Sequence, residues 1–138
     1  MSPWLEMIMI LRFLLAAGLG AGIGYQRERA GKAAGLRTHI LVSSGAALFT
    51  LVSIYGFTGA AVVDISRVAA GVVVGIGFIG AGVILRGQRE REVAGLTTAA
   101  TIWITAAVGL AAGAGMYLIS VIATAVTVGV LFLPKVRG

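Results

Sequence analysis

Residues 26–39 read QRERAGKAAGLRTH, and residues 88–98 read QREREVAGLTT, a near repetition of the same charged phrase. The two phrases hold 9 of the 16 charged residues, and long apolar stretches flank them. Over the 138 residues, 59% are apolar and 12% are charged, against roughly half and a quarter in soluble domains. A soluble domain of this length has too little interior to hide so much apolar surface. The composition therefore predicts one membrane-embedded domain.

The charged residues mark out the membrane spans. There are 18 uncharged residues between Arg67 and Arg86, 24 between His39 and Asp64, and 42 between Glu92 and Lys135. The last stretch is twice the roughly 20 residues that cross a bilayer, and Gly113-Ala114-Gly115 is its natural break. We predict an all-α membrane protein with five transmembrane helices, over approximately residues 5–25, 38–57, 67–86, 96–112 and 115–133. Helices are favoured because each satisfies its own backbone in lipid, and no strand-like alternation is present.

A cleaved signal peptide is the alternative for the first segment. Its start carries Glu6 and no basic residue, Arg12 interrupts its apolar part, and the internal repeat described next requires it. We therefore favour a helix that stays in the membrane.

The two phrases belong to a longer repeat. Gly20-Ala21-Gly22 matches Gly80-Ala81-Gly82 at an offset of 60, and Thr38 matches Thr98 at the same offset. Helices 1 and 2 with their loop therefore resemble helices 3 and 4 with theirs, and helix 5 is extra. Because both loops are expected on one side, the predicted repeat is parallel, as in some transporters.

The positive charges predict the orientation. The first loop, the third loop and the tail hold 9 of the 11 cations, and a five-helix topology places all three on one face. Positive charge near helix ends marks the cytoplasmic side, so we expect the N-terminus outside and the C-terminus in the cytoplasm. This explains the net charge of +6 without nucleic acid.

Many of the 21 glycines fall inside the predicted helices, often four residues apart. Such pairs let helix backbones touch in lipid, and we favour packing within the monomer, with a homodimer as the alternative. Gly75 to Gly80 fits G-x-G-x-x-G, but the motif lies in a membrane span rather than after a strand, so we interpret it as packing. The candidate packing residues are Gly18, Gly22, Gly71, Gly75, Gly80, Gly109 and Gly113.

Ionisable residues within a span are rare and deserve a functional hypothesis. Arg12 either reaches outwards to water or pairs with Asp64 or Glu6. Asp64 and Arg67 have the spacing of an intrahelical pair. The loop acids Glu28, Glu90 and Glu92 alternate with arginines, which is typical of a solvated loop. For His39, a hydrogen-bonded structural role is favoured over a proton relay.

Hydroxyl side chains form stripes on three predicted helices. They either bond back to their own helix or line a narrow polar seam. The stripes comprise His39 and Ser43, then Thr98, Thr101 and Thr105, and finally Ser120, Thr124 and Thr127.

The motifs resemble those of the MgtC/SapB family of bacterial membrane proteins over residues 5–133. The matching stretches are Gly24–Glu28, Ala34–His39, Ser44–Phe49, Asp64 with Arg67, Gly75–Leu85, Gly95–Ala100 and Trp103. The resemblance implies one transmembrane domain over residues 1–138, located in the bacterial inner membrane. Many members continue into a cytoplasmic, often ACT-like, domain. This chain ends at Gly138, as either a short member or a shortened form of a longer one.

The resemblance also implies a role. Family members support growth at low Mg²⁺ and survival in macrophages, and contact with the F-type ATP synthase is the best-supported activity. Two positions depart from the family pattern: many members have an acid at Gln26 and Asn at Thr97. The candidate functional polar residues are Arg12, Glu28, Arg37, Thr38, His39, Asp64, Arg67, Thr97 and Thr98.

The first functional hypothesis is a regulatory membrane protein that acts through helix contacts with the ATP synthase or other membrane proteins. The alternative is a transporter or channel for Mg²⁺ or another ion. Mg²⁺ prefers carboxylates, and none lies in the central spans. With no nucleophile–base pair, metal triad, phosphate loop or cysteine in the sequence, we expect no enzyme, no metal site and no cofactor.

Overall fold

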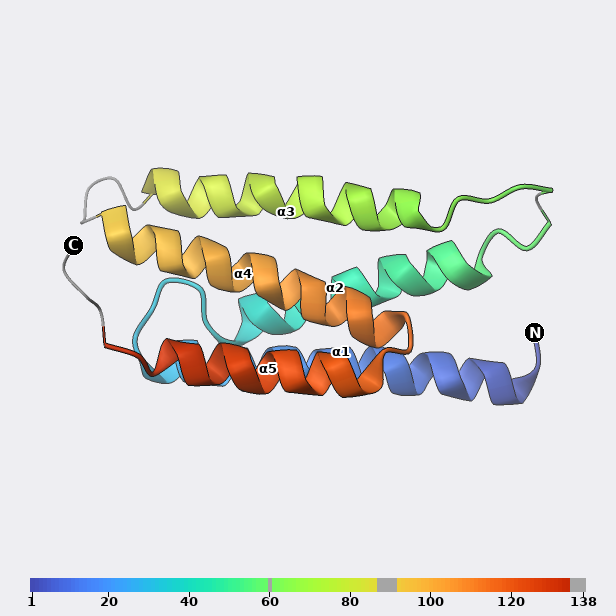
Figure 1. Cartoon of the computed structure of the whole chain (residues 1–138), viewed down its shortest axis with the longest axis horizontal. Helices are drawn as coiled ribbons and strands as arrows, with labels where there is room; N and C mark the ends of the chain where they lie inside the picture. The colour runs from blue at the N-terminus through green and yellow to red at the C-terminus, as the bar shows by residue number, and fades with distance from the viewer. Residues whose placement is uncertain (60, 87–91, 135–138) are drawn as a thin grey trace.

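The computed structural model describes residues 1–59, 61–86 and 92–134, without the side chains of residues 86 and 92–94. The described residues fold as five α-helices without a strand, which confirms the all-α prediction (Figure 1). The helices are α1 (Pro3–Arg29), α2 (Leu36–Tyr55), α3 (Ser66–Arg86), α4 (Glu92–Gly113) and α5 (Tyr117–Leu131).

Four of the described helices, α1 to α4, are long and apolar enough to cross a membrane. The fifth, α5, has only 15 residues and rises about 22 Å, less than the roughly 30 Å of hydrocarbon. The observed helix, Tyr117–Leu131, is therefore shorter at both ends than the predicted span 115–133. In contrast, α1 continues to Arg29, one turn beyond the predicted end at residue 25.

Two glycines end helices in the same way. Gly31 after α1 and Gly115 after α4 are the only described residues with positive φ, at +70° and +85°. After α1, the N–H of Lys32 donates to the Arg27 carbonyl and that of Gly31 to the Glu28 carbonyl. This is a Schellman motif, and Met116 and Gly115 repeat it after α4. The predicted break at Gly113-Ala114-Gly115 is therefore confirmed.

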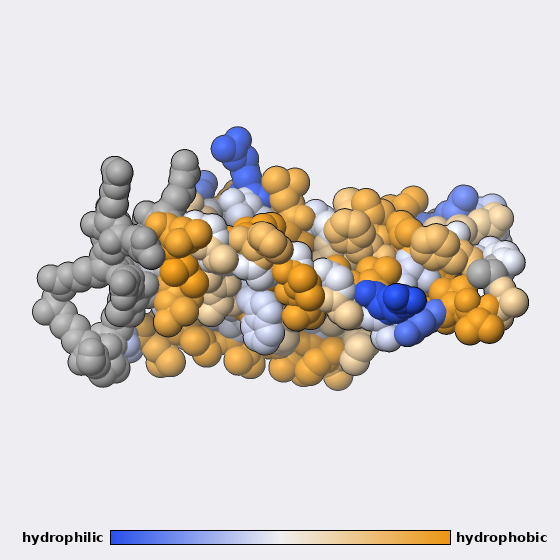
Figure 2. Space-filling model, turned by 90° about the horizontal axis from the view of Figure 1, so that it is seen from above, coloured by the Kyte–Doolittle hydropathy of each residue, from blue (hydrophilic) through white to orange (hydrophobic). Residues whose placement is uncertain are grey.

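The helices form an elongated bundle in which α4 contacts all four others. α2 packs mainly on α1 and α4, and α5 lies against α1 and α4 (Figure 1). α3 packs along α4 and contacts α2 only slightly, so it is peripheral. Figure 2 shows that the face carrying α3 is largely hydrophobic, as expected for a surface in lipid.

Glycines on both sides let α2 approach its neighbours closely. A Cβ atom at Gly24 of α1 would lie 2.8 Å from Cα of Leu36, and one at Gly20 would overlap the Ser43 hydroxyl. From α4, a Cβ at Gly109 would lie 2.7 Å from Cα of Ser43. These distances are below those found between real side chains, so only glycine fits there.

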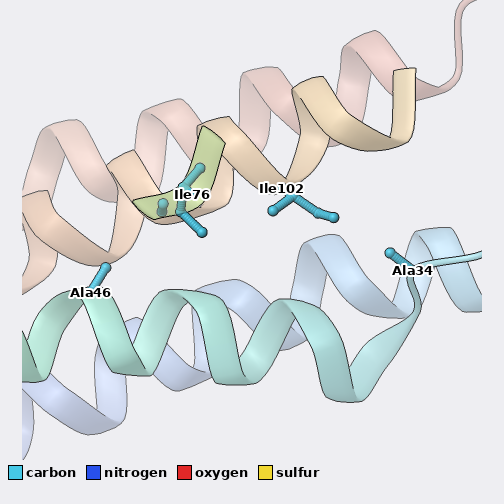
Figure 3. Packing of buried hydrophobic residues seen from close by; sticks show 5 residues of the cluster. Ala34, Ala46, Ile76 and Ile102 are labelled. Atoms are coloured by element: carbon cyan, nitrogen blue, oxygen red, sulfur yellow. The ribbon is translucent and has the colours of Figure 1, made fainter. Parts of the chain in front are cut away.

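The apolar core lies where three helices meet. Ile76 of α3 and Ile102 of α4 point into the space beside Ala46 of α2, with Ala34 at one end (Figure 3). Ile102 is fully buried, whereas Ile76 is one of the few buried residues of α3. The core is small because alanine and glycine bring the backbones together.

The predicted packing role holds for some glycines and not for others. Gly109 and Gly113 lie tightly against α2, and a Cβ at Gly80 would make an ordinary contact with Ala99. At Gly18, Gly22, Gly71 and Gly75 an added Cβ would meet nothing within 4 Å. Packing within the monomer is therefore wrong for these four, because Gly18 and Gly22 are exposed and Gly71 and Gly75 line an open groove beside α2.

The internal repeat stays a prediction, although two contacts correspond at its offset. Gly20 packs against the backbone of His39, and Gly80 packs against Ala99. The start of the second charged phrase, residues 88–91, lies outside the described residues and cannot be compared.

We predict that Gly109→Ala lowers the free energy of unfolding by about 1–3 kcal/mol, because the new methyl group meets the Ser43 backbone. The measurement is a thermal or denaturant unfolding curve in detergent micelles. The matched control is Gly82→Ala, where nothing lies within 4 Å and better helix propensity stabilises by up to about 1 kcal/mol. Equal effects of the two substitutions would contradict close packing at Gly109.

Candidate functional site

A buried arginine lies at the end of α1. The sequence predicted Arg27 in a solvated loop, which is wrong: Gln26 to Arg29 are good helix formers, so α1 continues until Gly31. The Arg27 side chain is only 3% exposed and turns into the bundle. Its Nη2 donates to the hydroxyl of Thr98 on α4, at 2.6 Å. This bond joins the second turn of α4 to the last turn of α1.

His39 lies beside this arginine, in the first turn of α2. The ring is fully buried, and Gly24 makes room for it, since a Cβ there would lie 3.0 Å from the His39 Cβ. Its Nδ1 is 2.8 Å from the Gly35 carbonyl oxygen. A carbonyl only accepts, so Nδ1 carries the proton and Nε2 of the neutral ring is an acceptor. The structural role predicted for His39 matches this bond.

Three buried polar atoms near the helix ends have no hydrogen-bond partner among the described residues. They are Oε1 of Gln26, Nε of Arg27 and Nε2 of His39. We call Arg27, His39 and Thr98 the buried polar cluster, whereas Gln26 lines a separate pocket between α1 and α5. Buried polar atoms are nearly always paired, so the two exceptions in this cluster, on Arg27 and His39, indicate a water site or a functional one.

The charge of Arg27 has no counter-ion within the described part of the chain. There, its hydrogen-bond partner is the neutral Thr98 hydroxyl. An unpaired charge inside a membrane protein is costly, by several kcal/mol, and usually marks a functional position. The cluster can therefore bind an acceptor or hold a water molecule between α1, α2 and α4.

The second charged site is at the other end of the bundle. Arg12 donates from Nε to the Tyr117 hydroxyl at 2.9 Å and from Nη1 to the Tyr55 hydroxyl at 2.8 Å. Its guanidinium also lies over both rings, 5.8 and 5.9 Å from their centroids. Nη1 further donates to the Gly113 carbonyl. The predicted partners Asp64 and Glu6 are therefore wrong. Arg12 ties α1 to the ends of α2 and α4 and to the start of α5.

Two candidate acids cap helices. Glu28 accepts from the N–H of Leu36 at 3.3 Å, which serves the free start of α2. The sequence predicted Glu28 in a solvated loop, which is wrong because Glu28 lies in the last turn of α1. Asp64 precedes α3 and accepts from the N–H and the hydroxyl of Ser66, at 3.0 and 2.6 Å. The structure thus directs Asp64 to Ser66 rather than to the Arg67 side chain, which is exposed.

The hydroxyl stripes bond to backbone carbonyls. Ser43 donates to the carbonyl of Ile40, Thr105 to that of Thr101, and Thr124 to that of Ser120. Thr101, Thr127 and Ser120 do the same within their own helices. Of the two readings left open by the sequence, bonding back to the helix is confirmed for these hydroxyls. They act as small residues that need no other partner.

The remaining candidates lie near the buried polar cluster. Arg37 is exposed in the first turn of α2, and Thr38 beside it is half-buried. Thr97 is half-buried in α4 and its carbonyl accepts from Thr101. The described residues contain no group of three His, Cys, Asp or Glu that could hold a metal. Glu90 and the side chain of Glu92 lie outside the described part.

Sequence reasoning missed Arg27, Tyr55 and Tyr117. Arg27 could have been found from the unbroken run of helix formers before Gly31. This run extends α1 through the charged residues up to Arg29. The tyrosines end α2 and begin α5 on the same side of the membrane as Arg12. Aromatic residues at such ends commonly anchor cations.

Comparison with known proteins gives a consistent family. The sequence model of the MgtC family matches residues 13–137. YhiD of Escherichia coli strain K12 is 49% identical over 127 residues, which cover 88% of this chain and 58% of YhiD. Protein SrpB of Synechococcus elongatus is 47% identical over 89% of this chain and 71% of its own. Protein MgtC of Salmonella typhimurium is 45% identical over 78% of this chain and 44% of its own. No solved structure matches.

We predict that Thr98→Val lowers the free energy of unfolding by about 1–3 kcal/mol, because Arg27 loses its buried acceptor. Unfolding in detergent micelles measures this. Thr105→Val is the matched control: its hydroxyl only bonds its own helix, so the loss there should be well below 1 kcal/mol. A smaller effect at Thr98 than at Thr105 would contradict the role of Thr98.

We also predict that Tyr117→Phe destabilises the bundle by about 1.5–3 kcal/mol, since a hydrogen bond to a charged group is lost while the ring stays. Tyr25→Phe is the control, because Tyr25 contributes its ring to Arg29 and Phe keeps that contact. In an Arg12→Met background the effect of Tyr117→Phe should largely vanish, which a double-mutant cycle tests.

Proposed function

The chain belongs to the MgtC family, and from this premise we propose that it is a regulatory protein of the bacterial inner membrane. It supports adaptation to low Mg²⁺ or to stress inside host cells by binding other membrane proteins. The chain spans about 58% of YhiD and 44% of Salmonella MgtC, so the proposal concerns the membrane domain that they share.

One observation carries the proposal: the buried hydroxyls are already bonded inside the bundle. A path for Mg²⁺ would need oxygen ligands that are free to replace its hydration shell. In the described core, Thr101, Thr105 and Thr124 donate to carbonyls of their own helices. Close glycine contacts between α1, α2 and α4 also leave little space at the centre. This arrangement favours a solid bundle that acts through its surface.

The surface offers α3 for such binding. Only 11% of its most apolar stretch is buried inside the chain, against 50% for α4. Phe78, at mid-helix, is 81% exposed. Exposed aromatic residues on a helix often carry much of the energy of binding. A membrane protein with one weakly covered helix is well suited to bind the helices of another.

The F-type ATP synthase is the partner we propose, on the basis of the family resemblance. The positive charges of the loops and tail support the accompanying topology, with the N-terminus outside and the C-terminus in the cytoplasm. In that orientation the buried polar cluster lies near the cytoplasmic face. Binding of this protein to the synthase limits the activity of the synthase when Mg²⁺ is scarce.

Ion transport is the alternative function. The full name of YhiD proposes a magnesium transporter, and that name refers to YhiD alone. In this chain, the observation that favours transport is the buried polar cluster, whose unpaired atoms could contact a hydrated ion or water. Flux through it would also require the bundle to open.

The test compares partner binding with ion flux for the same protein. A tagged full chain is purified from membranes of its host grown at low Mg²⁺, and co-purified proteins are identified by mass. The same preparation is placed in proteoliposomes with a Mg²⁺-sensitive dye inside. We expect synthase subunits in the first assay and no flux above empty vesicles in the second. Mg²⁺ flux without bound synthase would reverse the assignment.

We predict that Phe78→Ala reduces the co-purified partner by roughly tenfold or more, because it removes an exposed aromatic contact on α3. Leu118→Ala is the matched control: Leu118 is 75% exposed on α5 and should retain the partner. Equal losses would indicate that binding does not depend on α3.

A further inference from the structure

An open apolar groove lies between α2 and α3. Its volume is about 590 Å³, and its lining is entirely apolar side chains and glycine. Gly45 and Phe49 line it from α2, and Gly71, Gly75 and Ile79 from α3. At each of the three glycines an added Cβ would meet nothing within 4 Å, so a helix backbone from outside can approach closely.

The fold already contains one helix, α5, that fills a comparable seat, meaning the space between two neighbouring helices. α5 lies against both α1 and α4 and covers the surface between them. It turns small residues inwards, since Ser120 and Thr124, four positions apart, are its buried residues. A short apolar helix with a small-residue face therefore fits between two helices of this bundle.

The predicted repeat relates the filled seat to the open groove. It pairs helix 1 with helix 3 and helix 2 with helix 4, so the seat between α1 and α4 corresponds to the groove between α3 and α2. α5 runs in the same direction as α1, because four reversals separate them along the bundle (Figure 1). The corresponding occupant of the open groove runs in the same direction as α3 and presents small residues.

We propose that the chain forms a homodimer in which α3 of each copy lies in the α2–α3 groove of the other. α3 meets both requirements: it runs in the required direction when two copies share one membrane orientation, and Gly71 and Gly75 give it a small-residue face.

A twofold axis along the membrane normal produces this contact, and both copies then contribute the same surface to the interface. It brings Gly71 and Gly75 of the two copies together, as in dimers of small-xxx-small helices. Each α3 then packs on α3 and α2 of the other copy, which covers the helix that its own chain covers least. Phe78 does not line the groove and stays available to another protein. The dimer and the proposed function are thus separate claims.

The chain has no cysteine, so single-cysteine variants report contacts without background. Gly71→Cys should form a disulfide at the doubled mass in native membranes under mild oxidation, because the two Cα atoms approach within about 7 Å. Adding Gly75→Leu to that variant should reduce the cross-linked product by roughly tenfold or more, through overpacking in the groove. Adding Gly77→Leu should leave it unchanged. Gly77 is equally open in the monomer but does not line the groove.

Several outcomes would overturn the homodimer. In the first, the Gly71→Cys variant stays monomeric after oxidation and retains phospholipid in native mass spectrometry. That result would assign the groove to a lipid chain. A cross-link at any other mass would assign it to a different protein. Doubled mass from Gly18→Cys on α1 and not from Gly71→Cys would place the dimer contact on another face. Co-purification of the synthase is read separately, so failure of one claim does not imply failure of the other.

Discussion

The close approach of α2 to its two neighbours is the constraint on which this structure depends. In lipid, apolar surface gains little by leaving its surroundings, so helices associate through van der Waals contact between backbones. Ser43 is pressed between Gly20 of α1 and Gly109 of α4, where even a methyl group would overlap it. Only with these glycines do α1, α2 and α4 form one unit. The other helices then pack around this unit, α5 on α1 and α4, and α3 on α4.

The polar groups follow from that packing. Because the central helices are so close, a hydroxyl in the core bonds the nearest carbonyl, usually in its own helix. The two buried or half-buried arginines sit at opposite ends of the unit and tie helices together differently. Arg12 has two tyrosines and a carbonyl, so its charge is well solvated by the protein. Arg27 has one hydroxyl, and the unpaired atoms around it form the chemically unsatisfied part of the bundle.

The α1–α2–α4 unit and α3 differ in how tightly they are packed. The α1–α2–α4 unit is stabilised by contacts that tolerate little change, whereas α3 is held mainly from one side. Its groove with α2 and its exposed outer face are where a bundle of this kind can bind other helices. The chain belongs to the MgtC family, and a magnesium-related name occurs among its relatives. A regulatory role for this surface is our proposal, with transport as the competing function.

The sequence by itself determined the membrane class, the family, the five helices and the break between the last two. These features depend on hydropathy, charge and glycine at fixed positions along the chain, as the break at Gly113–Gly115 shows. The tertiary structure alone decided that Arg27 is buried on Thr98, that Arg12 meets Tyr55 and Tyr117, and that Gly109 packs while Gly75 stays open. The reason is that spacing along a helix fixes which residues share a face. Which face meets a neighbour depends on how each helix is rotated, and contacts from several distant segments set that rotation together.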